Sequence, residues 1–479
     1  MSYVTHAQKD WIRMLYGQEK DHEIYQSMLE EFGKMVEKNV LPAEKKTEVQ
    51  RAKNPYKEIH GKCKDEVANL KKEIKEILRN NPDESTRTDV VSDLFMDFLE
   101  RTSDHIKREE KIPQEVYSGI AEGGLPGISF SEELGGMGFP FTLFAALLES
   151  LGKASPSIAI RYAISNTCAE GLRFNREEGQ LSEKCEKILR ELIAGQKLAA
   201  FCLTEGSVSG SNIMREMQTR AVLSPDKKHY IINGNKMWIT NAETADVFAV
   251  FARTSDDPDH GISLFLVEKG QEGLRIGQVF EKRVVENSSL GEIIFKDVQV
   301  PLENVVGEIG SGARYGIRML NSGRITIAAL ATGLAQRAFE EYMEIAVDGK
   351  KSAGRQLIEY DRTRAKVAEM SMEINAARDM TYRAAWLKQR FDSAPSSEEF
   401  LREYVIAGNA AKLKASLVAQ KACDYLVKIG GASSIVKETH SLKHYLDSFL
   451  YFFGEAVPEV LENVISHMEL KKYEVKKGK

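Results

Sequence analysis

The spacing of apolar residues along the chain changes character twice. In residues 1–197, apolar positions recur every three or four residues, which is the period of amphipathic helices. The segment HEIYQSMLEEFGKMVEKNV has one apolar face, made of Ile24, Met28, Phe32, Met35 and Val36. The segment EKCEKILRELIAGQ closes this region, and Gly195 stands where a helix end favours glycine. We therefore expect a helical domain over residues 1–197.

Between residues 198 and 310 the pattern becomes that of β-strands. Short runs rich in β-branched and aromatic residues are separated by turn residues such as PDKK, NGN and DDPDHG. The runs are KLAAFCLTE, QTRAVLS, HYIINGNKMWITN, DVFAVFART, ISLFLVEK, LRIGQVF and GEIIFKDVQVP. Because no helical segment separates them, they predict an antiparallel β-domain, either a barrel or a sandwich.

Helical spacing returns at residue 311 and continues to residue 479. Long segments of low charge, such as YGIRMLNSGRITIAALATGLAQRAFEEYMEIAVDG, predict helices that are buried in a bundle. Ser397 can cap one of them, Gly430 and Gly431 can end it, and the last helix is expected near Pro458. The whole order predicts an α+β multidomain protein with an N-terminal helical domain, a central antiparallel β-domain and a C-terminal four-helix bundle.

Composition and charge exclude several classes of function. The formal net charge of -5 gives no sign of a nucleic-acid partner. Five scattered cysteines without a CxxC pair, and few histidines without an HExxH spacing, predict no disulfide framework and no metal site. The chain has no signal-peptide pattern and no apolar run of about 18 residues. We therefore expect a cytoplasmic protein without a membrane span.

Two stretches at the ends of predicted strands carry candidate chemistry. FCLTEGSVSGSN leads into a Ser/Gly loop, which offers backbone N–H groups without side-chain bulk and suits a phosphate or a ring edge. NGNKMWITNA places Trp238 and Thr240 on one face of a strand, where an indole can stack on a flat cofactor. Taken alone, such a loop more often only connects strands, and such an indole more often belongs to a core.

Together these stretches resemble the acyl-CoA dehydrogenase family. FCLTEGSVSGSN looks like the family's LTEPxAGSD segment, and KMWITN is similar to its KxWITN segment. GEIIFKDVQVPLENVVGEIGSG resembles its strand exit, and GLAQRAFEEYMEIA and GRQLIEYDRTRAKVAEM resemble its first two C-terminal helices. The resemblance implies FAD as cofactor, an acyl-CoA thioester oxidised across Cα–Cβ, and electron-transfer flavoprotein as electron acceptor. It also implies a homodimer or a homotetramer.

The same resemblance implies binding roles residue by residue. The residues implied to border or cover the flavin are Phe201, Leu203, Thr204, Trp238, Ile239 and Thr240. Ser211 is implied to lie near the phosphates of the acyl-CoA, and Asn321 near the CoA moiety. Further cofactor contacts are implied at Lys350, where the family has an arginine, and at Gly430 and Gly431.

The resemblance points to Glu455 as the catalytic base. In most members a glutamate follows an aspartate by eight residues, and Glu455 follows Asp447 by eight. Some members instead place the glutamate on the long helix, directly before an arginine. Here that arginine is Arg324, implied to help position the active site, and the residue before it is Gly323. Glu455 is therefore the remaining candidate.

A base that removes a proton α to a thioester carbonyl works better when burial raises its pKa. We expect Phe452 and Phe453 to bury Glu455. The alternative is that Glu455 is an exposed charge beside a helix start. Glu459, one turn into the last helix, is expected to have such a helix-start or surface role.

Several positions depart from the family's pattern. Ala456 and Val457 replace the glycine and threonine that usually follow the base. Residues 43–108 look like a highly charged helical insertion. Two alternative functions therefore stay open. One is a flavoprotein of the same fold that acts on a carrier-protein-bound acyl group or with oxygen, and the other is a non-catalytic relative that keeps the scaffold.

Overall fold

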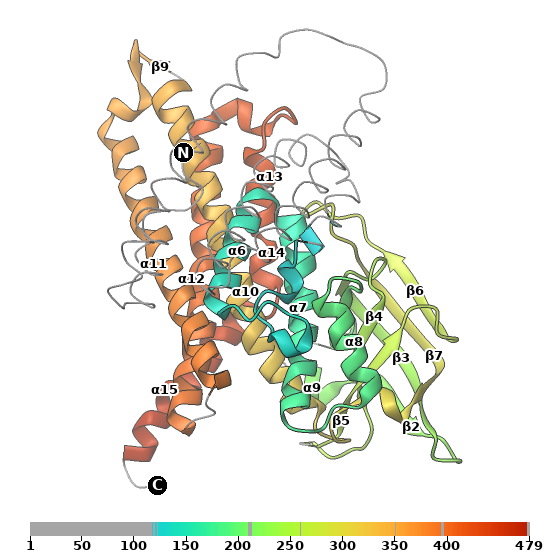
Figure 1. The fold of residues 1–479 in the computed structure, drawn as a ribbon. Coiled ribbons are helices and arrows are strands. Elements are labelled where there is room, and N and C mark those ends of the chain that lie inside the picture. Colours follow the sequence, from blue (N-terminus) through green and yellow to red (C-terminus); the bar gives the residue numbers. More distant parts are fainter. Residues whose placement is uncertain are drawn as a thin grey trace, which may run out of the picture. The chain divides into compact units, whose positions relative to one another are not determined.

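The computed structural model describes Tyr117, Ile120, Ala121 and residues 123–476, with gaps at 209–212, 259, 350 and 394–396. Two compact units divide the chain, residues 1–123 and residues 124–479. The predicted insertion at 43–108 lies outside the described residues. The second unit holds all the named elements described below (Figure 1).

Three helices open the second unit. They are α6 (Phe141–Ala154), α7 (Pro156–Glu177) and α8 (Glu183–Ile193), and two short 3-10 turns, η2 (Leu125–Gly127) and η3 (Glu132–Leu134), precede them. Ser155 caps α7 and Ser182 caps α8, because each serine hydroxyl accepts a backbone N–H of the first turn. Gly195 follows α8 with a φ of 68°, which glycine adopts without strain.

One sheet of eight strands follows, in the order β6-β7-β3-β2-β4-β5-β8, with β1 paired to β4 off this path. The strands are β1 (Ala199–Cys202), β2 (Arg220–Leu223), β3 (His229–Thr240), β4 (Val247–Arg253), β5 (Ile262–Glu268), β6 (Leu274–Val279), β7 (Leu290–Pro301) and β8 (Val305–Val306). The neighbours are antiparallel, except that β1 and β2 each meet β4 in parallel. The register of β3 against β7 shifts between Lys236 and Ile239, the stretch that contains Trp238.

Long helices make up the C-terminal region. They are α10 (Gly312–Glu344), α11 (Asp361–Ser393), α12 (Glu398–Gly430), α13 (Ser441–Ser448), α14 (Leu450–Phe453) and α15 (Pro458–Lys476). Ser397 caps α12 by accepting the N–H of Phe400 at 3.3 Å, and Gly431 ends it with a φ of 60°. Both helix ends and the start of α15 at Pro458 were predicted, and Glu459 lies exposed in the first turn of α15.

Several short elements connect these helices and strands. They are α9 (Ile213–Glu216), η4 (Leu302–Asn304), the π-turn η5 (Ile345–Gly349), β9 (Lys351–Ser352), β10 (Arg355–Gln356), η6 (Leu357–Glu359) and η7 (Gly431–Ile435). β9 and β10 form a separate two-stranded hairpin between α10 and α11.

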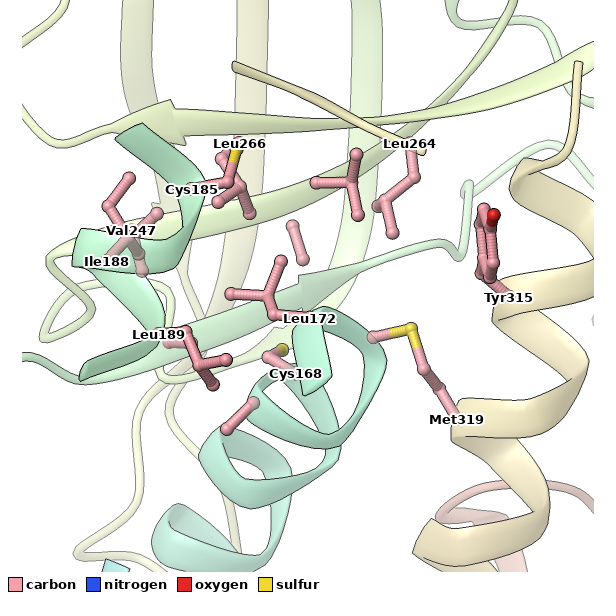
Figure 2. Packing of buried hydrophobic residues seen from close by; sticks show 14 of the residues in the cluster. Cys168, Leu172, Cys185, Ile188, Leu189, Val247, Leu264, Leu266, Tyr315 and Met319 are labelled. Atoms are coloured by element: carbon pink, nitrogen blue, oxygen red, sulfur yellow. The ribbon is translucent and has the colours of Figure 1, made fainter. Parts of the chain in front are cut away.

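Helices α10, α11 and α12 run side by side, α6 packs on α10 and α11, and α7 packs on α10 and on strand β1 (Figure 1). Figure 2 shows how α7, α8 and α10 pack on one face of the sheet. The labelled members of this cluster are Cys168, Leu172, Cys185, Ile188, Leu189, Val247, Leu264, Leu266, Tyr315 and Met319. This shared core holds α7 and α10 against the sheet, and both helices carry side chains of the site described below.

The predicted order of a helical N-terminal domain, a central β-domain and a C-terminal helical domain is confirmed. All seven predicted runs form strands, β1 to β7. The sequence did not predict β8, β9, β10 or α9, because two to four residues are too few to show a period. Among the described residues, we find no helix that is long and apolar enough to cross a membrane.

Candidate active site

Glu455 lies in the turn between α14 and α15. Its φ of 63° falls in the left-handed region, which costs a residue with a side chain about 1–2 kcal/mol. Its Oε1 lies against Gly323 of α10, so closely that a Cβ built on Gly323 would approach it to 2.5 Å. Among the described residues, Oε2 of Glu455 is buried and has no hydrogen-bond partner. The turn thus presents a desolvated carboxylate with one free oxygen.

Burial and two cations set the charge of this carboxylate. Burial raises the pKa of Glu455 to about 7, although Arg324 and Lys412 act to lower it. Burial lowers the pKa of Arg324, and the nearby Glu455 opposes that shift. Desolvation therefore outweighs the attraction of the cations, and Glu455 has a pKa suited to exchanging a proton near neutral pH.

Asn321 and Arg324 lie one turn apart on α10 and are both buried. Arg324 donates a hydrogen bond from Nη1 to Oδ1 of Asn321 at 3.0 Å. Its Nε has no partner within the described part of the chain. Asn321, Arg324 and Glu455 therefore form one cluster, in which an unpaired donor and an unpaired acceptor can meet a ligand.

Lys412 of α12 is also part of this cluster. Its side chain is fully buried, and its Nζ donates to the carbonyl oxygens of Phe452 at 3.3 Å and Ala456 at 2.5 Å. Burial lowers the pKa of Lys412 to about 7; Arg324 acts in the same direction and Glu455 opposes it. Lys412 could not be predicted from the sequence, because Lys414 stands two positions away and helical spacing alone does not tell which lysine faces inward.

Our expectation that Phe453 buries Glu455 is wrong. Phe453 is 67% exposed and Phe452 is only partly buried, whereas Tyr451 is fully buried. These residues form the short helix α14, so consecutive side chains point in different directions. The enclosure of Glu455 includes the backbone of Gly323.

A second cluster joins the end of β1 to β3. Lys236 and Glu205 form a buried ion pair at 2.8 Å, and Nζ of Lys236 also donates to the carbonyl of Leu203 at 3.1 Å. Burial lowers the pKa of Lys236 to about 8, although Glu205 opposes the shift. The N–H of Met237 donates to the carbonyl of Thr204 at 2.9 Å. These contacts fix Leu203 and Thr204, two residues predicted to border the flavin, against β3.

Trp238 exposes 54% of its surface, although its strand neighbour Ile239 is buried. Its φ of 62° turns the backbone out of the regular strand path, and its ring centroid lies 4.7 Å from that of Phe280. Thr240 is half-buried at the end of the same strand. An exposed indole supported by a second ring offers an apolar wall for a flat ligand.

Phe201 and Cys168 connect the strands to the helices. Phe201 is half-buried on β1 and makes an edge contact with Phe251 at 5.1 Å between ring centroids. Burial raises the pKa of the Cys168 thiol, and the charges of Cys202 and Glu455 add to that shift. Because such effects act over short distances, Cys168 of α7 lies near both β1 and the carboxylate. Figure 2 shows Cys168 in the core that α7 shares with the sheet.

The remaining predicted residues do not join this cluster. Gly430 lies eighteen residues after Lys412 on α12, which is roughly 27 Å along a helix axis. There it leaves room for Ser434, whose Oγ would lie 2.0 Å from an added Cβ, and Gly431 turns the chain. Ser211 and Lys350 fall outside the described residues.

Models of protein families match three consecutive parts of the chain. They are the N-terminal domain of acyl-CoA dehydrogenase at residues 81–195, its middle domain at 200–298 and its C-terminal domain at 310–468. The first match begins within the segment 43–108 that we predicted to be an insertion.

Known proteins of this kind are similar over most of the chain. The "Probable acyl-CoA dehydrogenase YngJ" of Bacillus subtilis is 33% identical over 393 residues, which are 80% of this chain and 97% of the relative. The short-chain specific acyl-CoA dehydrogenase of Clostridium acetobutylicum is 34% identical over 387 residues, 79% of this chain and 96% of the relative. A subunit of the caffeyl-CoA reductase-Etf complex of Acetobacterium woodii is 29% identical, over 81% of this chain and 99% of the relative.

The fold is also similar to a solved structure. Butyryl-CoA dehydrogenase from Megasphaera elsdenii superposes with a TM-score of 0.72 at 28% identity, covering 79% of this chain and 98% of that one. The similarity in sequence and in fold thus extends through the β-sheet, α10, α12 and the turn that carries Glu455.

Proposed function

The chain belongs to the acyl-CoA dehydrogenase family of FAD-dependent oxidoreductases, whose members act on CH–CH groups, and we propose that it dehydrogenates an acyl-CoA thioester with Glu455 as the base. Glu455 removes the proton from Cα, and the second hydrogen leaves Cβ with its electron pair. The observation that carries this proposal is the buried, unpartnered Oε2 of Glu455.

The state of the carboxylate supports its role as a base. With a pKa of about 7, Glu455 is ionised in a large fraction of molecules at neutral pH and still holds an abstracted proton well. An exposed glutamate, with its usual pKa near 4.3, would be a far weaker base. The cations Arg324 and Lys412 keep the ionised form accessible in a site that burial alone would hold protonated.

Arg324 and Asn321 are proposed to position the substrate end of the site. Their mutual hydrogen bond fixes the guanidinium, so its unpaired Nε keeps one direction. A fixed donor beside the base can hold a polar substrate group without a large entropic cost when the substrate binds. Ser211 is proposed to contact the acyl-CoA phosphates.

The residues on β1 and β3 fit a flavin ring. The exposed indole of Trp238 offers an apolar face, and the fixed main chain at Leu203 and Thr204 offers an edge beside it. We therefore propose that Leu203, Thr204 and Trp238 hold the ring, with Phe201, Ile239 and Thr240 beside them. When bound, FAD supplies the acceptor for the hydride that leaves Cβ.

Electron-transfer flavoprotein is the proposed electron acceptor. The support is the Acetobacterium woodii relative, which is a subunit of a complex with Etf. We further propose a homodimer or homotetramer, and domains at residues 1–197, 198–310 and 311–479. Cofactor contacts are proposed at Lys350 and, at the far end of α12, at Gly430 and Gly431.

An anaerobic bleaching experiment tests the reaction. The purified yellow protein is mixed with acyl-CoA thioesters of graded length, and loss of flavin absorbance is followed by stopped flow. We expect bleaching that falls by at least about a thousandfold in Glu455→Gln. Glu459→Gln, on the exposed first turn of α15, is the matched control and should bleach like the unmodified protein.

Other results would redirect the proposal. Bleaching that survives Glu455→Gln moves the base to another residue. Bleaching only by acyl groups on a carrier protein, or turnover only with oxygen, changes the substrate or the acceptor. A protein that cannot be loaded with FAD contradicts the enzymatic proposal.

A further inference from the structure

The turn that carries Glu455 needs external support. Glu455 adopts a left-handed backbone conformation although it has a side chain, and Gly454 before it does not. A single residue stays in that conformation only when its surroundings hold it there. The contacts that do so therefore also set the direction of the carboxylate.

Two side chains of α12 supply these contacts. Nζ of Lys412 donates to the carbonyl oxygens of Phe452 and Ala456, which lie on either side of Glu455. Oγ of Ser416, one turn further along the same face of α12, lies 2.8 Å from the carbonyl oxygens of both Tyr451 and Lys412, so its one proton is shared between the turn and α12. Together they hold the main chain before and after Glu455.

The charge of Lys412 acts on the same carboxylate. Among the described residues, Lys412 makes no ion pair with an acidic side chain, and its hydrogen bonds go to main-chain carbonyls. The charged and titratable groups that act on Glu455 are Arg324 from α10, Lys412 from α12 and Cys168 from α7. Arg324 also acts on the carboxylate by its charge, but its hydrogen bond goes to Asn321 and not to the turn. Of these two cations, Lys412 is the one that also bonds to the turn.

From these contacts we propose that Lys412 is a positioning residue, which holds the turn at Glu455 by its hydrogen bonds and favours the ionised carboxylate by its charge. The proposal rests on the proposed role of Glu455 as the base. It adds a residue that touches neither substrate nor flavin and acts on the reaction through Glu455.

Three variants on one helix separate charge from hydrogen bonding. Lys412→Met keeps the length of the side chain and removes both its charge and its donors. Ser416→Ala removes one hydrogen bond to the turn and no charge. Lys414→Met is the matched control, because Lys414 is partly exposed and pairs with Glu373 on the neighbouring helix α11.

Two measurements on the flavin-loaded protein report the two effects. The first is the protonation midpoint of the Glu455 carboxyl, followed by infrared difference spectroscopy and assigned by the band lost in Glu455→Gln. The second is the rate of single-turnover flavin reduction as a function of substrate concentration, with the melting temperature as a check on folding.

We expect Lys412→Met to raise the carboxyl midpoint above about 7, because the attraction of the protonated form of Lys412 is lost. Its limiting reduction rate should fall about 10- to 100-fold, while half-saturation by substrate stays within about twofold. Ser416→Ala should slow reduction about threefold or more and leave the midpoint unchanged. Lys414→Met should match the unmodified protein in both.

A folded Lys412→Met variant with an unchanged midpoint and rate overturns the proposal. If that variant does not fold, Ser416→Ala decides, and an unchanged reduction rate in it overturns the anchoring by α12. A wrong assignment of Glu455 as the base gives a different result from a wrong assignment of Lys412, because Glu455→Gln would then still show bleaching. In that case the infrared midpoint still reports whether Lys412 acts on Glu455.

Discussion

At the scale of single residues, Glu455 is held in a state that costs stability. Its pKa is about 7 in the folded protein and near 4.3 in the unfolded chain, so the folded state binds the proton more tightly. The penalty is small below pH 4, grows as the pH rises through 4.3 and levels off above 7. The raised pKa that suits Glu455 to its proposed role as a base thus weakens the fold at neutral pH.

Glu455→Gln should therefore be more stable than the unmodified protein, and increasingly so at higher pH. We expect the difference in the free energy of unfolding between the two proteins to be about 3 kcal/mol larger at pH 8 than at pH 4. Denaturant unfolding of the flavin-loaded protein at both pH values measures it. Glu459→Gln serves as the control, and a pH-independent difference would show that Glu455 keeps an ordinary pKa.

Gly323 gives a second test at this scale. An added Cβ would meet Oε1 of Glu455 at 2.5 Å, and the end of that flexible side chain can move away. Gly323→Ala should therefore slow flavin reduction about 10- to 100-fold and change unfolding free energy by no more than about 1 kcal/mol. Gly408→Ala is the control, since its Cβ would meet only ordinary contacts from 3.5 Å. Equal reduction rates in the two variants would contradict this geometry.

The family's eight-residue distance from an aspartate, here Asp447, predicts Glu455 as the base, but the sequence did not predict the surroundings of that residue. The expected contribution of Phe453 is wrong, because a helix of four residues turns that ring outward. Lys412 and Lys414 have the same chemical character, and only the packing of α12 separates them. Residue types near the site could therefore be read from the sequence, whereas burial and hydrogen bonding required the fold.

At the scale of elements, the predicted strands and long helices were recognised because each has enough residues to show its period. What the period does not show is how two elements are tied together. The sequence KMWITN suggested a role for its indole and its hydroxyl. In the structure, Lys236 of the same stretch links β3 to the end of β1, because it binds Glu205 and the carbonyl of Leu203.

The Lys236–Glu205 ion pair leads to a prediction about the stability of the region around β1 and β3. Lys236→Met leaves Glu205 buried without its cation, which should reduce the free energy of unfolding by about 3–5 kcal/mol. Adding Glu205→Gln should recover part of that loss, because the buried charge is gone. Denaturant unfolding measures the stability of both variants.

The control is Arg220→Met, which breaks the exposed Arg220–Asp256 pair and should reduce the free energy of unfolding by less than about 1 kcal/mol. If Lys236→Met lost no more stability than Arg220→Met, the buried Lys236–Glu205 pair would not stabilise the fold.

At the scale of the second unit, Asp447 joins the central sheet region to the C-terminal helices. Its Oδ1 accepts the N–H of Val285 at 2.7 Å, from the loop between β6 and β7, and Lys443 pairs with its other oxygen. Lys282 lies in the same loop, where burial lowers its pKa to about 8 and Asp447 opposes that shift. One buried carboxylate thus accepts a main-chain N–H from the sheet region and pairs with Lys443 on α13.

Asp447→Ala removes this connection eight residues before Glu455. The N–H of Val285 then stays buried without an acceptor, which should reduce the free energy of unfolding by about 1–3 kcal/mol. The pKa of Lys282 should fall further, because Asp447 is the negative charge that most opposes the effect of burial. Proteolysis by trypsin should then cleave first after Lys282 or Arg283, since the loop opens locally before the helices unfold.

The control is Asp424→Ala, whose ion pair with Lys428 lies on the surface of α12. Equal cleavage of the two variants would mean that the loop is held by other contacts and that the two domains are joined elsewhere.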